Sequence, residues 1–128
     1  MWKKLLVNVS TGPVTALTRA TSAEVVNDPA AAAVSRRLIE EAIAVAAAHG
    51  FVDLGIDPVA RTRPGSRAQH KPSMLQDIEL RRPPEIDTMA RIVQDFAREA
   101  GVPTPTLDTV LALLIRLSRT LGIYAGEG

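Results

Sequence analysis

Apolar residues recur at intervals of three and four positions through most of the chain, which is the spacing of amphipathic helices. The pattern is clearest in residues 30–49, 86–100 and 106–121, and it predicts a long helix over each of them. Residues 1–10 repeat it over a shorter length. No segment alternates apolar and polar residues as a half-buried strand does. The pattern therefore predicts an all-α domain, compact and built from about five to seven helices.

Several of these helices carry recognisable boundary residues. Asp28 is a candidate N-cap with Pro29 in the first turn behind it, and Gly50 has the place of the residue that follows a helix C-terminus. Gly12 and Pro13 interrupt the first apolar stretch. Because proline disrupts a helix interior, we expect one helix to end there and a second, short helix to begin at Pro13.

Residues 71–87, KPSMLQDIELRRPPEID, hold two helix starts and most of the candidate polar chemistry. Ser73 stands three positions before Gln76, the spacing of a capping box, so we expect Ser73 to be the N-cap of a short helix. A proline pair then ends that helix and begins the next. Glu85 and Asp87 fall in the new first turn, where the helix dipole favours carboxylates.

Composition narrows the classes of function. The 128 residues suit one domain, and the net charge of +1, with acids and bases interspersed, indicates neither a nucleic acid nor an anionic membrane as partner. The chain has no cysteine, and His49 and His70 have no ligand-spaced partners, so we expect no metal. The longest apolar run, residues 42–48, is too short to cross a membrane. No signal peptide is recognisable, so we expect a cytoplasmic protein.

Residues 51–70 have no clear period and contain several glycines and prolines. We interpret this segment as a loop with at most one turn of helix. Its arginines, Arg61, Arg63 and Arg67, are expected to be solvated.

Three motifs stand in a fixed order along the chain. Residues 2–8 read WKKLLVN, residues 73–87 read SMLQD and EID on either side of a basic, proline-containing turn, and residues 101–105 read GVPTP. Together they resemble the C-terminal domain of ketopantoate reductases (2-dehydropantoate 2-reductases). The resemblance covers essentially the whole chain. It implies one domain over residues 1–128 with the helical fold of 6-phosphogluconate dehydrogenase C-terminal-like domains.

The same resemblance implies roles for four polar residues. Lys4 matches the family's general acid and Glu85 a carboxylate that helps to orient the lysine and the substrate, so both are expected to be catalytic. Asn8 and Ser73 match substrate-binding residues. Plainer interpretations stand beside these: a solvated lysine, an N-cap serine and a first-turn carboxylate. Asn8 is the least expected of the four, because asparagine is a poor residue for a helix interior.

The resemblance implies the substrate-binding and catalytic half of an NADP-dependent oxidoreductase. Such an enzyme reduces a 2-keto acid such as ketopantoate to its 2-hydroxy acid, as in pantothenate biosynthesis. The sequence has no G-x-G-x-x-G between a strand and a helix, so the N-terminal dinucleotide-binding domain is absent and we expect the chain alone to bind no NADP. The implied partners are the 2-keto acid, a Rossmann-type nucleotide-binding domain in cis or in trans, and a second copy in a homodimer.

Gly12 and Leu107 depart from the pattern, because the family often has asparagine at both positions. These departures leave the exact substrate open. A free-standing, non-catalytic helical module that oligomerises is therefore the alternative to an oxidoreductase half, and in either case we expect the chain alone to be inactive.

Overall fold

The computed structural model describes residues 2–52, 54–65, 71–83 and 86–124. This part of the chain forms seven α-helices and contains no strand. In order they are α1 (Trp2–Thr18), α2 (Ser22–Val26), α3 (Pro29–Ala48), α4 (Pro58–Arg61), α5 (Ser73–Glu79), α6 (Ile86–Ala100) and α7 (Pro105–Thr120). The all-α expectation is confirmed. Within the same ranges, none of the helices is both long enough and apolar enough to span a bilayer.

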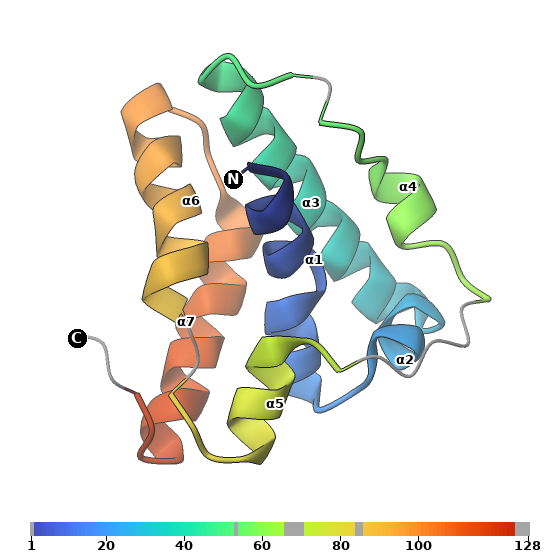
Figure 1. Cartoon of the computed structure of the whole chain (residues 1–128), viewed down its shortest axis with the longest axis vertical. Helices are drawn as coiled ribbons and strands as arrows, with labels where there is room; N and C mark the ends of the chain where they lie inside the picture. Colours follow the sequence, from blue (N-terminus) through green and yellow to red (C-terminus); the bar gives the residue numbers. More distant parts are fainter. Residues whose placement is uncertain (1, 53, 66–70, 84–85, 125–128) are drawn as a thin grey trace.

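Helix α1 lies at the centre of the domain (Figure 1). Helix α3 packs on one side of it, α6 and α7 pack on the other, and α5 lies over its C-terminal half. Helix α2 also contacts α1, whereas α4 packs on α3. The largest fully buried side chains come from α1, α2, α3, α5 and α7: Leu6, Leu38, Ile39, Met74, Leu75, Ile78, Leu107, Leu114, Val9, Val25 and Val45. The other helices are thus assembled around α1.

Helix α1 continues through Gly12 and Pro13, so the predicted break there is wrong. Pro13 has no N–H to donate to the carbonyl of Val9, and an interior proline costs a helix about 3 kcal/mol. Both Gly12 and Pro13 are buried. The Thr15 hydroxyl donates to the Gly12 carbonyl at 3.0 Å, which satisfies an acceptor beside the proline. Packing on several sides of α1 offsets the local cost of the proline.

The boundaries predicted for α3 are confirmed. The Asp28 carboxylate accepts hydrogen bonds from the N–H groups of Ala30 and Ala31, at 3.0 and 3.3 Å, with Pro29 in the first turn. Gly50 follows the helix with a φ of +87°, a conformation that side chains with a Cβ rarely adopt. The bounds predicted for α6 also agree, and the one turn of helix allowed within residues 51–70 is α4.

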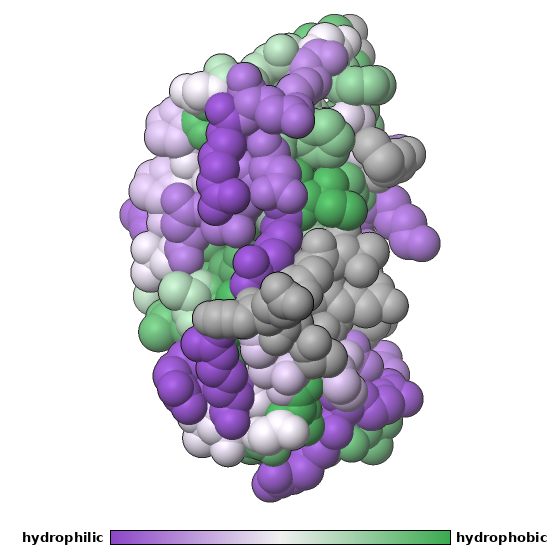
Figure 2. Space-filling view, turned by 90° about the vertical axis from the view of Figure 1, so that its left-hand side faces the viewer, coloured by the Kyte–Doolittle hydropathy of each residue, from purple (hydrophilic) through white to green (hydrophobic). Residues whose placement is uncertain are grey.

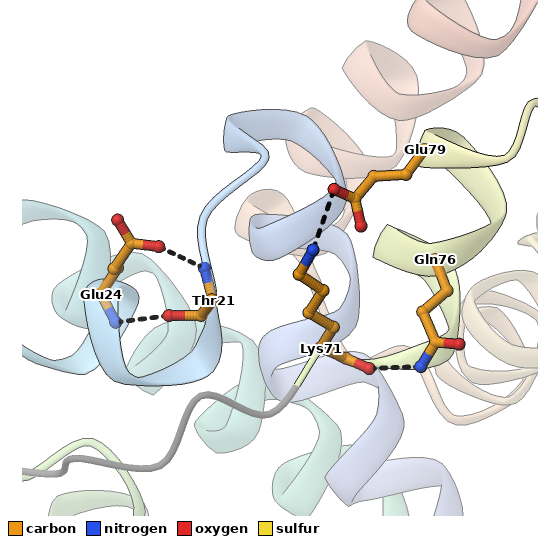
Figure 3. Close-up of polar contacts among 5 residues, drawn as sticks. All are labelled: Thr21, Glu24, Lys71, Gln76 and Glu79. Carbon is orange, nitrogen blue, oxygen red and sulfur yellow. Dashed lines mark hydrogen bonds and ion pairs between the residues drawn. The ribbon is translucent and has the colours of Figure 1, made fainter.

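The predicted capping box at Ser73 is wrong, because Pro72 holds the N-cap position and α5 begins at Ser73. The Gln76 side-chain amide instead donates to the carbonyl of Lys71 at 2.7 Å (Figure 3). A complete capping box opens α2, which the sequence analysis missed. There the Thr21 N–H donates to Glu24 Oε1 at 2.9 Å, and the Glu24 N–H donates to Thr21 Oγ1 at 3.3 Å (Figure 3).

The N-terminus of α7 is capped by a carboxylate from another helix. Glu41 on α3 accepts hydrogen bonds from the N–H groups of Thr106 and Leu107, at 2.9 and 2.8 Å. Thr104, at the N-cap position, makes no side-chain bond to the helix backbone. The negative charge of Glu41 also lies at the positive end of the α7 dipole. Glu41 therefore joins α3 to α7.

Replacing Glu41 with alanine should lower the free energy of unfolding by about 1–2 kcal/mol, the usual cost of losing a helix cap. The N–H of Leu107 would then lack an acceptor beside a side chain that is buried. Denaturant unfolding followed by circular dichroism measures the change. Glu40→Ala is the matched control, because Glu40 is the exposed neighbour on the same helix. Equal stabilities for the two variants would contradict the role of Glu41.

The capping box predicts a pH effect at α2. Hydrogen bonds from the Thr21 backbone and, second, the Thr21 side chain lower the pKa of Glu24 below its ordinary value of 4.5. The ionised Glu24 carboxylate in this capping box therefore stabilises the fold above pH 4.5. The stabilisation is lost as the pH falls through the lowered pKa of Glu24. Thr21→Ala should raise the pKa of Glu24 part of the way back, because the backbone bond remains. An NMR titration of the Glu24 carboxyl carbon checks this, with Thr109→Ala as control.

Candidate functional site

Two of the four predicted site residues project from one face of α1. Lys4 and Asn8 are one helical turn apart, and Gly12 follows one turn later on the same side. Lys4 is exposed, Asn8 is half-buried and Gly12 is buried. Lys4, Asn8 and Gly12 thus form a stripe along α1, which runs from solvent at Lys4 into the protein at Gly12.

Helix α5 meets this stripe at its buried end. A Cβ built on Gly12 would lie 3.4 Å from Met74 Sδ and 3.7 Å from Met74 Cγ. Ser73, the third predicted site residue, precedes Met74 and is the first residue of α5. The structure thus brings the backbone of Ser73 to the helix that carries Lys4 and Asn8. Glu85, the fourth, lies outside the described residues.

The polar groups of the stripe have no partners in the described part of the chain. No carboxylate of the described residues lies within ion-pairing distance of the Lys4 ammonium. The Asn8 side chain makes no hydrogen bond to any described residue. A half-buried asparagine inside a helix is ordinarily engaged elsewhere, because its amide otherwise competes with the helix backbone. An ammonium and an amide on one face can together bind a carboxylate or a polarised carbonyl oxygen.

Polar contacts hold the two ends of α5. Lys71 Nζ lies 3.2 Å from Glu79 Oε2, and this ion pair joins the segment before the helix to its last turn (Figure 3). At the other end, Arg82 pairs with Asp77 at 3.3 Å. Neither pairing was predicted from the sequence, although residues 71–82 contain both basic and acidic side chains.

An aromatic cluster fixes the start of α1, two residues before Lys4. The Trp2 ring lies 5.2 Å from that of Phe96 and 5.8 Å from that of Phe51 between centroids. His49 Nε2 lies 2.8 Å from the carbonyl oxygen of Phe96, at hydrogen-bonding distance, and its ring meets the edge of Phe96. His49 is thus a packed structural residue. Among the described residues, no group of three or more histidine or acidic side chains is placed to hold a metal ion.

The side of the domain over α6 is largely hydrophilic, and Figure 2 shows hydrophilic residues gathered there. Asp95 and Arg98 form an exposed ion pair at 3.3 Å, and Gln94 donates to Asp108 of α7 at 2.7 Å. These groups satisfy one another at the surface, and exposed pairs of this kind contribute little to stability. Leu107, a second departure from the resemblance, is buried in the core and belongs to no polar site.

Comparison with known proteins gives a consistent result. The family model described as ketopantoate reductase PanE/ApbA C terminal matches residues 1–118. A 2-dehydropantoate 2-reductase from Mesorhizobium japonicum is 40% identical over 126 residues, covering 98% of this chain and 38% of the relative. Another from Mycobacterium tuberculosis is 36% identical, covering 91% of this chain and 40% of the relative. The chain thus spans about two fifths of the length of these curated relatives.

Solved structures agree with the sequence matches. A dimeric ketopantoate reductase from Staphylococcus aureus superposes with a TM-score of 0.80 at 29% identity, covering 94% of this chain and 43% of that one. A D-mandelate dehydrogenase in complex with NADH gives a TM-score of 0.81 at 25% identity, with the same coverage of 94% and 43%. In each of these two solved structures, more than half of the polypeptide has no counterpart in this chain.

Proposed function

Because this chain belongs to the family of ketopantoate reductase C-terminal domains, we propose that it is the substrate-binding and catalytic half of an NADP-dependent oxidoreductase. Its substrate is a 2-keto acid such as ketopantoate, which is reduced to the 2-hydroxy acid. A Rossmann-type nucleotide-binding domain, in cis or in trans, completes the enzyme. The proposal rests on family membership together with the face of α1 that carries Lys4 and Asn8.

The observation that carries the proposal is the pair of unpartnered polar groups on α1. Lys4 is exposed and Asn8 is half-buried, and neither is engaged by another described side chain. A 2-keto acid offers a carboxylate and an adjacent carbonyl, which need a cation and fixed hydrogen-bond donors. The stripe supplies both on one rigid helix, and rigid elements hold such groups more precisely than loops do.

In the proposed reaction, Lys4 donates a proton to the ketone oxygen as negative charge develops on it. Asn8 donates a hydrogen bond that fixes the substrate beside Lys4, and Ser73 binds the substrate from the start of α5. Glu85 orients the lysine and the substrate. Only the hydride comes from outside these residues, from the nicotinamide of the complete enzyme. In this proposal, the chain supplies the proton donor and the groups that position the substrate.

The proposed assignment of the cofactor to another domain is supported by the glycines of the described residues. A pyrophosphate is usually bound by a glycine-rich turn between a strand and a helix N-terminus. The glycines with positive φ here stand singly in turns that follow helices or join them: Gly50, Gly55, Gly65, Gly101 and Gly122. We therefore assign the cofactor to the partner domain and derive no step from this chain's own binding of it.

A second function, that of an oligomerisation module, is favoured by an apolar surface away from α5. An open depression lies between the end of α3 and the start of α4, with mainly apolar lining residues: Ile43, Ala47, Phe51, Val52, Leu54, Gly55, Ile56 and Asp57. Phe51 is 50% exposed and Val52 is 66% exposed. Exposed apolar patches commonly mark contacts with other proteins.

We propose a homodimer for either function; sedimentation as a strict monomer at high concentration would refute the homodimer.

Replacing Lys4 with alanine should lower kcat about 100-fold or more, the usual contribution of a general acid. KM for ketopantoate should change much less, because proton donation acts mainly in the transition state. The assay follows NADPH oxidation by this domain combined with its nucleotide-binding domain. Lys3→Ala is the matched control, because Lys3 is the exposed neighbour on the same helix. Equal loss of activity in the two variants would exclude a specific role for Lys4.

The chain alone should neither bind nor oxidise NADPH, because its sequence has no G-x-G-x-x-G and the described residues include no glycine-rich turn between a strand and a helix. NADPH fluorescence, titrated with the purified domain in the presence and absence of ketopantoate, measures both properties. Saturable micromolar binding would show that the cofactor site lies within residues 1–128.

A further inference from the structure

Helix α5 is held to the rest of the domain by α1. Among the described helices, α5 packs closely on α1 and on no other to a comparable extent. Its apolar side, Met74, Leu75 and Ile78, is fully buried in that contact region. A helix of seven residues is too short to be stable by itself. The position of α5 therefore depends on how its side chains fit the surface of α1.

One of these contacts is between Met74 and Gly12. Gly12 is the one described glycine without a positive φ, so it is not required by a turn. A Cβ at this position would lie 3.4 Å from Met74 Sδ, and a larger side chain would occupy the place of the thioether. At the other described glycines, an added Cβ would meet no atom within 4 Å.

From this contact we propose that Gly12 and Met74 are positioning residues, which together set the distance of α5, and thus of Ser73, from the Lys4–Asn8 face of α1. The inference rests on the proposed function, because it assigns the contact a role in binding the 2-keto acid. Gly12 lies one turn beyond Asn8 on the same face, and Met74 adjoins Ser73 in sequence. A shift of α5 away from α1 would move Ser73 away while leaving Lys4 and Asn8 in place.

A competing explanation for Gly12 is its neighbour Pro13. The proline ring clashes with the Cβ of a preceding residue in helical conformation, so glycine is favoured there whatever lies opposite. Alanine and leucine at position 12 share this clash, because both have a Cβ. Only leucine adds atoms beyond Cβ that must displace Met74. The difference between Gly12→Ala and Gly12→Leu therefore isolates the contact with α5.

The test measures ketopantoate affinity by calorimetric titration of the full chain. Gly12→Leu should weaken binding about tenfold relative to Gly12→Ala, the size of one lost hydrogen bond. Adding Met74→Ala should restore the affinity of Gly12→Leu, because the shorter side chain makes room for leucine. Amide hydrogen exchange is measured in parallel. The amides of α5 should exchange faster in Gly12→Leu than in the unaltered chain, and the double variant should return to the slower rate. The amides of α3 should exchange at the same rate in all variants.

Each outcome decides between the explanations. Equal affinities for Gly12→Ala and Gly12→Leu, or loss without rescue by Met74→Ala, would overturn the positioning role and leave the proposed function intact. If the unaltered chain binds no ketopantoate, the proposed function fails, and the inference fails with it as a statement about substrate. The amide exchange rates of α5 then still show whether Gly12 sets the position of that helix. If Gly12→Leu does not fold, failure of Met74→Ala to rescue folding likewise overturns the role.

Discussion

The structure depends on α1 remaining helical through Gly12 and Pro13. Five of the other helices in the described chain pack on this one element, so a break would divide the core. The interior proline costs about 3 kcal/mol. Fully burying a single large apolar side chain contributes about 1.5–3 kcal/mol, and α1 buries Trp2, Leu6 and Val9 among others. The packing term therefore exceeds the backbone term, and the helix is continuous.

The central helix also carries the polar stripe, which links stability to the proposed chemistry. Lys4 and Asn8 lie on the element that packs against α3, α6 and α7. Helix α5 is different, since it is short and bound mainly to α1. The candidate site thus combines a rigid half on α1 with a half on α5 whose position follows from side-chain fit.

Much of the fold could be predicted from local sequence because its determinants are local. The Asp28 cap, the following proline and Gly50 lie within or beside α3, and periodicity together with the preceding proline pair predicted the bounds of α6. The exact partner of a side chain could not be predicted where the partner lies far away in the sequence. The carboxylate of Glu41 caps α7 across 65 positions of sequence, and nothing near residue 41 indicates that target. At Ser73 a local signature was present, but Pro72 took the N-cap position. For the site, the sequence indicated Lys4 and Asn8 as candidate residues, whereas the fit of Met74 on Gly12 required the fold.

The first turn of α1 raises a further physical question, because helix ends fray and chain termini are usually poorly ordered. Lys4 lies in that turn. Trp2 is only 3% exposed, however, and its ring packs against the rings of Phe96, Phe51 and His49. His49 is itself held by the carbonyl oxygen of Phe96. The aromatic cluster therefore connects the start of α1 to the end of α3 and to α6, and holds Lys4 on a fixed turn. The backbone of Lys4 is fixed in this way while its side chain is exposed, which is the arrangement that the proposed proton donor needs.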